Sequence, residues 1–220
     1  SLGWLVVFPF VLGGFIGTAR AAIEGTDTSI HQFVTTARTH YVRLLSATVA
    51  FLLIILGTAI GAGTVGLVFG VGSMALAAIN ETAAFVGGVV SLVVWLVSLL
   101  VVIMFVQFYD AAIVIEEQSV TDSFRRSVAL VRANLTSVVG FSLVWTLLVN
   151  LFFIPEYLVQ LTVTDAAPAE VLPVDPGIPI AVLLPVGIGL SAVGFAYFYT
   201  VYTAYYLRLI SDAPFSADAA

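Results

Sequence analysis

The chain has 220 residues, of which 61% are hydrophobic and 9% are charged, against roughly 45–50% and about 25% in an ordinary soluble domain. Thirteen acidic residues outnumber seven arginines, and lysine and cysteine are absent. The acidic balance argues against nucleic acid as a partner, because neutralising phosphates needs a basic face. The absence of cysteine excludes disulfides and thiolate metal sites.

Five apolar runs dominate the chain, and each is long enough to cross a bilayer core, which needs ~20 apolar residues. The expected spans are residues 2–18, a second from Leu44 to a point between Val65 and Gly70, then 83–108, 135–161 and 178–207. We therefore expect an all-α, polytopic transmembrane helix bundle that forms a single integral membrane domain over residues 1–220. The first run begins without a charged flank, so we also expect a truncated start.

The basic residues lie in or beside three segments, and the opposite ends of the apolar runs carry only acids. The three segments hold Arg20, Arg38 and Arg43, then Arg125, Arg126 and Arg132, and finally Arg208. Short loops rich in basic residues stay on the cytoplasmic side. The sequence therefore predicts a multi-pass protein of the cell membrane, with its N-terminus outside and its C-terminus in the cytoplasm.

Two inner segments, residues 30–44 and 120–135, have apolar side chains at helical spacing and polar side chains on the other faces. Ser119 and Asp122 have the spacing of a capping box at the start of the second. Such helices usually lie in the headgroup plane. We expect them to join two spans; docking a partner or sensing lipid is the alternative. All the arginines named above except Arg20 are expected to contact lipid headgroups.

An internal repeat relates the two halves of the chain. With a shift of 90 residues, Ala21–Ile23 matches Ala111–Ile113, and the order span, acidic turn, amphipathic helix, span recurs. We expect two parallel repeats, about 1–80 and about 81–165, and an unpaired final span at about 178–208. Arg20 matches Asp110 under this shift, so the two are predicted to pair.

Motifs that would carry chemistry are weak. Gly61, Gly63 and Gly66 fit a dinucleotide fingerprint, but they lie inside an uncharged apolar run without the required βαβ unit. Close helix packing is the better interpretation. His31 and His40 fall on opposite faces of one helix and cannot chelate one metal from it. No catalytic, cofactor-binding or metal-binding residue is therefore expected.

A few polar residues within or at the ends of the spans form a candidate polar site in the membrane. Asn150 lies near the middle of the fourth span and is expected to bond to a neighbouring helix. The other candidates are Gln107, Asp110, Glu156 and Arg20. In the fifth span, aromatic residues between Phe195 and Tyr206 are expected to form an interface belt, with a ligand-stacking platform as the alternative.

Two resemblances accompany this layout. The absence of lysine beside an acid excess resembles proteins of haloarchaea. The segment 108–134, from Phe108-Tyr-Asp-Ala-Ala through Ser123-Phe-Arg-Arg-Ser to Val131-Arg-Ala-Asn, looks like an inner loop of uncharacterised multi-pass haloarchaeal proteins. More distantly, it is similar to the membrane domain of some glycerophosphoryl diester phosphodiesterases. The catalytic barrel of those enzymes has no counterpart in this chain, so the resemblance does not imply their activity.

The scarcity of polar groups in the spans favours a non-catalytic scaffold or accessory membrane component. A transporter or permease for a small solute or lipid is the alternative, supported by the repeat, Asn150, Pro155, Pro185 and the glycine-rich second span. Membrane lipids are the expected partners, together with a protein partner or a second copy of the chain.

Overall fold

The computed structural model describes residues 2–26, 28–77, 80–163 and 180–212. These ranges form helices and no strand. The helices are α1 (Leu2–Ile23), α2 (Ile30–Ala77), α3 (Glu81–Val106), α4 (Tyr109–Ile115), α5 (Val120–Ala133), α6 (Leu135–Val163) and α7 (Ile180–Asp212). Five segments within them are long and apolar enough to cross a membrane. The all-α architecture with five candidate spans is thus confirmed.

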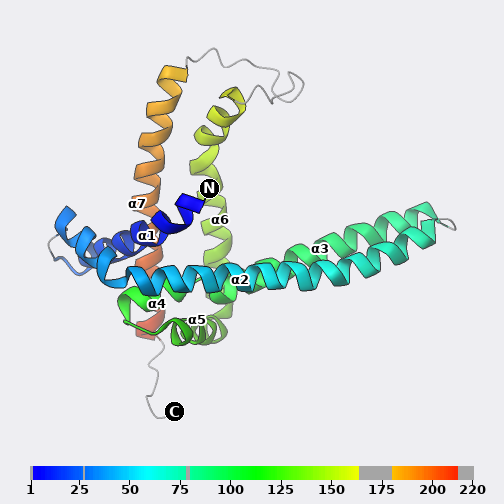
Figure 1. Cartoon of the computed structure of the whole chain (residues 1–220), viewed down its shortest axis with the longest axis horizontal. Helices are drawn as coiled ribbons and strands as arrows, with labels where there is room; N and C mark the ends of the chain where they lie inside the picture. Colours follow the sequence, from blue (N-terminus) through cyan, green and yellow to red (C-terminus); the bar gives the residue numbers. More distant parts are fainter. Residues whose placement is uncertain (1, 27, 78–79, 164–179, 213–220) are drawn as a thin grey trace, which may run out of the picture.

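The helices form two arms that diverge from a common base (Figure 1). One arm is the antiparallel pair α2 and α3, and the other is the pair α6 and α7. The base, called the closed end below, consists of α4, α5 and the adjoining parts of α3, α6 and α7. Helix α1 packs along α2 and also contacts α7 and α4, so it links both arms to the closed end.

The segment expected as a first amphipathic helix is the beginning of α2, which runs without interruption from Ile30 to Ala77. The prediction of a separate helix in the headgroup plane was wrong, because the apolar side of this segment packs on α1. A Cβ atom at Gly14 would lie 2.4 Å from the Phe33 ring, and one at Gly17 would lie 2.3 Å from Cγ2 of Thr36. These glycines let the two helices approach closely.

The second amphipathic segment is the separate helix α5, as predicted, and Ser119 caps it. The Ser119 hydroxyl accepts a hydrogen bond from the Asp122 N–H at 3.3 Å. The apolar side of α5 does not face lipid, however. Leu130 and Val131 are buried in the hydrophobic core, and α5 packs against α4 and α3. It therefore covers the base of the bundle.

The hydrophobic core lies at the closed end rather than along the arms. Every residue of α4 is buried, and Phe108 stacks on Tyr202 with 5.7 Å between ring centroids. Phe198, Tyr202 and Tyr206 are buried as well. The prediction that the aromatic stripe of α7 forms an interface belt was wrong, because these rings pack inward on α4 and α6.

The arms expose large apolar side chains along most of their length. Phe85 is 72% exposed, and Leu143 and Leu147 are 67% and 70% exposed. A soluble monomer rarely exposes a continuous apolar surface of this extent. Lipid chains can cover such surfaces, which agrees with the membrane class that the sequence predicts.

The contact between α1 and α2 can be tested at Gly17. The substitution Gly17→Ala should destabilise the protein by about 1–3 kcal/mol, because the added methyl group overlaps Thr36 in a packed interface. Thermal unfolding of the purified protein in detergent measures this change. Gly61→Ala is the matched control, since a Cβ there meets nothing within 4 Å, and it should cause no loss. Equal behaviour of the two variants would contradict the close approach.

Candidate binding cavity between the arms

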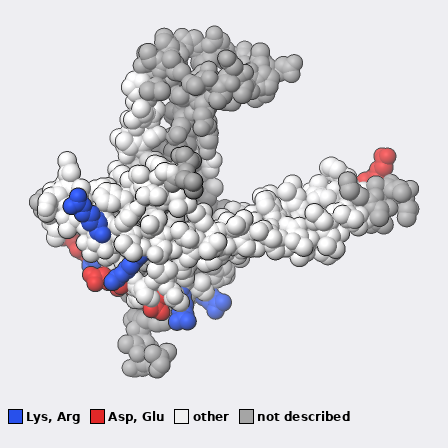
Figure 2. All heavy atoms as spheres, in the orientation of Figure 1, with Lys and Arg blue, Asp and Glu red and all other residues white. Residues whose placement is uncertain are grey.

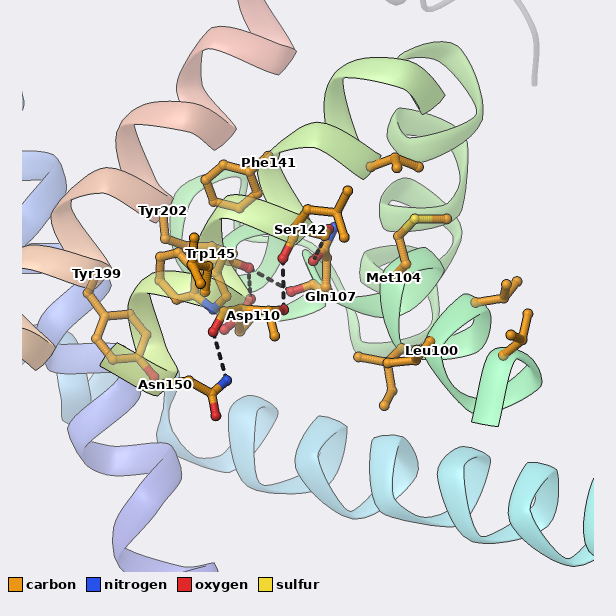
Figure 3. A pocket seen from close by; sticks show the side chains of 17 residues that line it. Leu100, Met104, Gln107, Asp110, Phe141, Ser142, Trp145, Asn150, Tyr199 and Tyr202 are labelled. Atoms are coloured by element: carbon orange, nitrogen blue, oxygen red, sulfur yellow. Dashed lines mark hydrogen bonds between the residues drawn. The ribbon is translucent and has the colours of Figure 1, made fainter. Parts of the chain in front are cut away.

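A cavity of about 830 Å³ lies between α3 and α6, where the two arms begin to diverge (Figure 3). Ligand pockets usually measure roughly 300–1,000 Å³. Its walls are mostly apolar: Val97, Leu100, Val101, Ile103 and Met104 come from α3, and Val139, Phe141, Leu143, Trp145 and Leu147 come from α6. Tyr199 and Tyr202 of α7 complete the lining together with a few polar side chains. The cavity is therefore apolar along its walls with local polar groups.

The largest group of polar atoms lies at the closed end, where α3 ends and α4 begins. The Ser142 hydroxyl donates to Oε1 of Gln107 at 3.2 Å. The Tyr202 hydroxyl contacts the backbone carbonyl oxygen of Gln107 at 2.7 Å and also Oδ1 of Asp110. Asp110 is only 8% exposed, and its Oδ1 accepts the Ala111 N–H at 2.7 Å. Two sequence-predicted polar residues, Gln107 and Asp110, thus share one site.

The break between α3 and α4 produces this arrangement. Helix α3 ends at Val106, and Gln107 and Phe108 carry the chain to the start of α4 at Tyr109. The Ser127 hydroxyl of α5 donates to the Phe105 carbonyl at 2.8 Å and accepts the Phe108 N–H at 3.1 Å. It satisfies backbone groups that the break leaves without helical partners. Sequence reasoning overlooked Ser127, whose only signal was a small polar residue within an apolar stripe.

A line of polar side chains continues from the closed end along α6. Ser142, Thr146 and Asn150 all line the cavity, and their four-residue spacing places them on one face of the helix. Only Asn150 was predicted as part of a site, although this spacing was visible in the sequence. Its Nδ2 donates to the Thr146 carbonyl of the same helix at 2.8 Å. The expected bond to a neighbouring helix was therefore wrong.

Arg20 and Asp110 do not pair, contrary to the prediction from the repeat. Arg20 donates to Oε1 of Glu24 at 2.7 Å and to the Ile115 carbonyl at 3.0 Å, so it contacts the end of α4. Asp110 lies at the start of α4 and bonds to Tyr202. The helical rise of α4 separates the two charges. Glu156 lies in α6 among residues whose side chains fall outside the described part of the chain.

Arginines gather around the closed end, while Glu81 lies at the far tip of the α2–α3 arm (Figure 2). Five of the six arginines expected at headgroups are exposed: Arg38, Arg43, Arg125, Arg132 and Arg208. Arg126 differs from them, since its Nε lies 3.0 Å from Oε2 of Glu116 and its side chain is 14% exposed. Tyr206 also bonds to Glu116. The prediction for Arg126 was wrong, because this pair turns the side chain toward the bundle.

The lining of the cavity is chemically suited to an apolar or amphiphilic molecule. The described residues contain no group of three or more His, Asp or Glu that could hold a metal ion.

The glycine motif at 61–66 lies within continuous helix, where Gly63 and Gly66 approach Trp95 and Ser91 of α3. Gly63 and Gly66 thus lie at a helix contact, whereas Gly61 meets no neighbour within 4 Å, and the motif forms no phosphate loop.

The fold and the cavity define the class as an all-α membrane helix bundle with an apolar cavity between its arms. Residues 1–209 match the model of a domain of unknown function, DUF7847. Because this match covers most of the chain, the chain belongs to the DUF7847 family. Comparisons with curated proteins and with solved structures gave no match.

The role of Ser127 in holding the α3–α4 break is testable. Ser127→Ala leaves the Phe108 N–H and the Phe105 carbonyl without this partner, and the free energy of unfolding should fall by about 1–3 kcal/mol. Thermal unfolding in detergent measures the loss. Ser98→Ala is the control, because that exposed hydroxyl bonds only to the Val94 carbonyl of its own helix. A loss of the same size in both variants would show that Ser127 has no special role.

Proposed function

We propose that the protein is a non-catalytic accessory component of the membrane with a ligand-binding role. Its ligand is an amphiphilic molecule of the membrane, which lies in the cavity between α3 and α6. The observation that carries this proposal is the cavity itself, which is about 830 Å³ in volume and polar at one end. Apolar walls suit a hydrocarbon chain, and the group at Gln107 and Asp110 suits a polar end.

Transport is the second candidate, and the polar line of Ser142, Thr146 and Asn150 favours it. A carrier needs access from both sides of the membrane. The closed end is filled by side chains that are fully buried, among them Phe108, Ile113 and Val131. This packing supports binding over transport. Uptake of a labelled amphiphile into sealed vesicles containing the protein would reverse the preference.

If the cavity binds a lipid, labelling there should saturate, and a bulky side chain introduced on α6 should block it. A photoactivatable alkyl-chain lipid should label α3 and α6 peptides to saturation, whereas labelling of the exposed face around Leu53 should rise in proportion to the probe. Thr146→Trp should reduce the saturable labelling several-fold, because the indole fills the cavity that Thr146 lines. Mass spectrometry of the labelled peptides measures both effects.

Thr64→Trp is the matched control for this experiment. Thr64 is exposed on α2, and its hydroxyl bonds to the carbonyl four residues earlier at 2.8 Å, as that of Thr146 does. The control variant should label like the unchanged protein. Labelling of α3 and α6 that fails to saturate would refute the binding function.

The proposed orientation places the closed end at the cytoplasmic side and the tip of the α2–α3 arm outside. The exposed arginines around the closed end and Glu81 at the distal tip support it. Because residues 1–220 contain no cysteine, a single-cysteine variant of this chain carries one labelling site. An impermeant maleimide should label Thr82→Cys in intact cells, and Arg38→Cys and Arg125→Cys only after permeabilisation. Labelling of the two arginine positions from opposite sides would contradict this topology.

The finer relationships are part of the same proposal. The acidic composition without lysine supports a haloarchaeal type of protein. The segment that carries the likeness to the membrane domain of glycerophosphoryl diester phosphodiesterases, residues 108–134, corresponds to α4 and α5. In the proposed repeat, the first copy consists of α1 and α2, and the second copy consists of α3, α4, α5 and α6. The amphipathic segment of the first copy is continuous with the span that follows it, whereas that of the second copy is the separate helix α5.

A further inference from the structure

One buried polar atom at the closed end of the cavity lacks a hydrogen-bond partner within the described part of the chain, and a buried carboxylate lies beside it. Nε2 of Gln107 is buried and donates no hydrogen bond, although Oε1 of the same side chain accepts one from Ser142. Asp110 is 8% exposed and lines the cavity, and its Oδ1 accepts hydrogen bonds from the Ala111 N–H and the Tyr202 hydroxyl. A carboxylate has about four acceptor positions, so Asp110 can accept a further hydrogen bond. A buried polar group without a partner is costly, so the Gln107 amide points to a ligand in the cavity.

The charge around these atoms restricts the ligand. Among the described residues, none of those that line the cavity is basic. The nearby guanidinium groups are engaged elsewhere, Arg20 with Glu24 and Ile115 and Arg126 with Glu116. A phosphate would therefore meet the Asp110 carboxylate without a compensating cation. Like charges repel strongly where water is excluded, which disfavours anionic headgroups.

The hydrogen-bonding roles select between the remaining headgroups. Gln107 Nε2 is a donor and needs an acceptor, while the Asp110 carboxylate is an acceptor and can take a further donor. An ammonium group has donors only and would leave the Gln107 amide unsatisfied. A hydroxyl group accepts from one atom and donates to the other. Figure 3 shows Gln107 and Asp110 beside each other near Ser142 and Tyr202.

The walls of the cavity provide the place for the rest of the molecule. From the polar end, Met104, Leu100 and Val97 follow on α3 at helical spacing, and Leu143 and Leu147 follow on α6. Because α3 ends and α6 begins at the closed end, both series run away from it along the two arms. They form two apolar sides that fit a hydrocarbon chain.

We propose that the cavity binds an uncharged lipid with a free hydroxyl group, which accepts a hydrogen bond from Gln107 and donates one to Asp110 while its chain lies between α3 and α6. A long-chain or isoprenoid alcohol and a diacylglycerol share this chemistry. The inference rests on the proposed binding function and specifies its ligand.

The test uses the full chain in vesicles and photoactivatable probes with the same alkyl chain: an alcohol, its methyl ether and the corresponding amine. The methyl ether cannot donate to Asp110. Loss of one hydrogen bond corresponds to about a tenfold weaker half-saturation of labelling on α3 and α6. A diacylglycerol probe is tested in the same way. The hydroxyl lipid with the lower half-saturation concentration, alcohol or diacylglycerol, is then assigned as the class of ligand.

Gln107→Met should weaken both the alcohol and the methyl ether by a similar factor, because the ether oxygen still accepts from Gln107, whereas Ser98→Ala, the control on α3, should change neither. Gln107→Glu provides a readout that a folding defect cannot imitate. It replaces the donor with a second acceptor and should reverse the preference from the alcohol to the amine.

The two proposals fail in different ways. Equal half-saturation of the alcohol and the ether at a saturable site would overturn the hydroxyl assignment and leave the binding function standing. Labelling that does not saturate with any probe would overturn both. Retention of the alcohol preference in Gln107→Glu would also exclude Gln107 as the donor.

Discussion

The structure depends on how the chain satisfies its backbone where α3 stops and α4 begins. In a membrane, N–H and carbonyl groups that leave a helix must find partners within the protein, since each unsatisfied group costs several kcal/mol. Ser127 supplies both partners from α5. This bond allows the chain to turn into α4, which fills the core, while α3 leads away from α6. The cavity between the arms is a consequence of that turn.

The polar side chains of the bundle form two kinds of hydrogen bond, within one helix along the arms and between elements at the closed end. Along the arms, the hydroxyls of Thr58, Thr64 and Thr146 donate to the carbonyl four residues earlier in the same helix. These groups cost little in a lipid environment and need no ligand. At the closed end, Ser142, Tyr202 and Gln107 bond between elements far apart in the sequence. Among the described residues, buried polar atoms without a partner also occur at Thr18, His40 and Thr203, but of these four residues only Gln107 lines the cavity.

The sequence was sufficient for whatever depends on apolar length and local pattern. The expected limits of the third and fourth spans lie within about two residues of α3 and α6, and the Ser119 cap was foreseen. Amphipathic patterns do not say what covers their apolar side, so the start of α2 and the helix α5 were assigned to lipid instead of to protein. Sequence matching paired Arg20 with Asp110, because it carries no information on depth along α4. Gln107 and Asp110 were named as candidates, but their meeting with Ser142 and Tyr202 requires the tertiary fold.

The uncharged part of α2 is longer than the hydrocarbon layer of a bilayer is thick. This uncharged part from Leu44 to Ala77 lies within one unbroken helix and is about 50 Å long at ~1.5 Å per residue. A hydrocarbon layer is ~30 Å thick, and a longer apolar helix accommodates the mismatch by inclining or by thickening the lipid around it. Because α3 is packed along the same rod, a thinner bilayer would incline both helices together. The separation of the arms, and with it the width of the cavity, would then follow bilayer thickness.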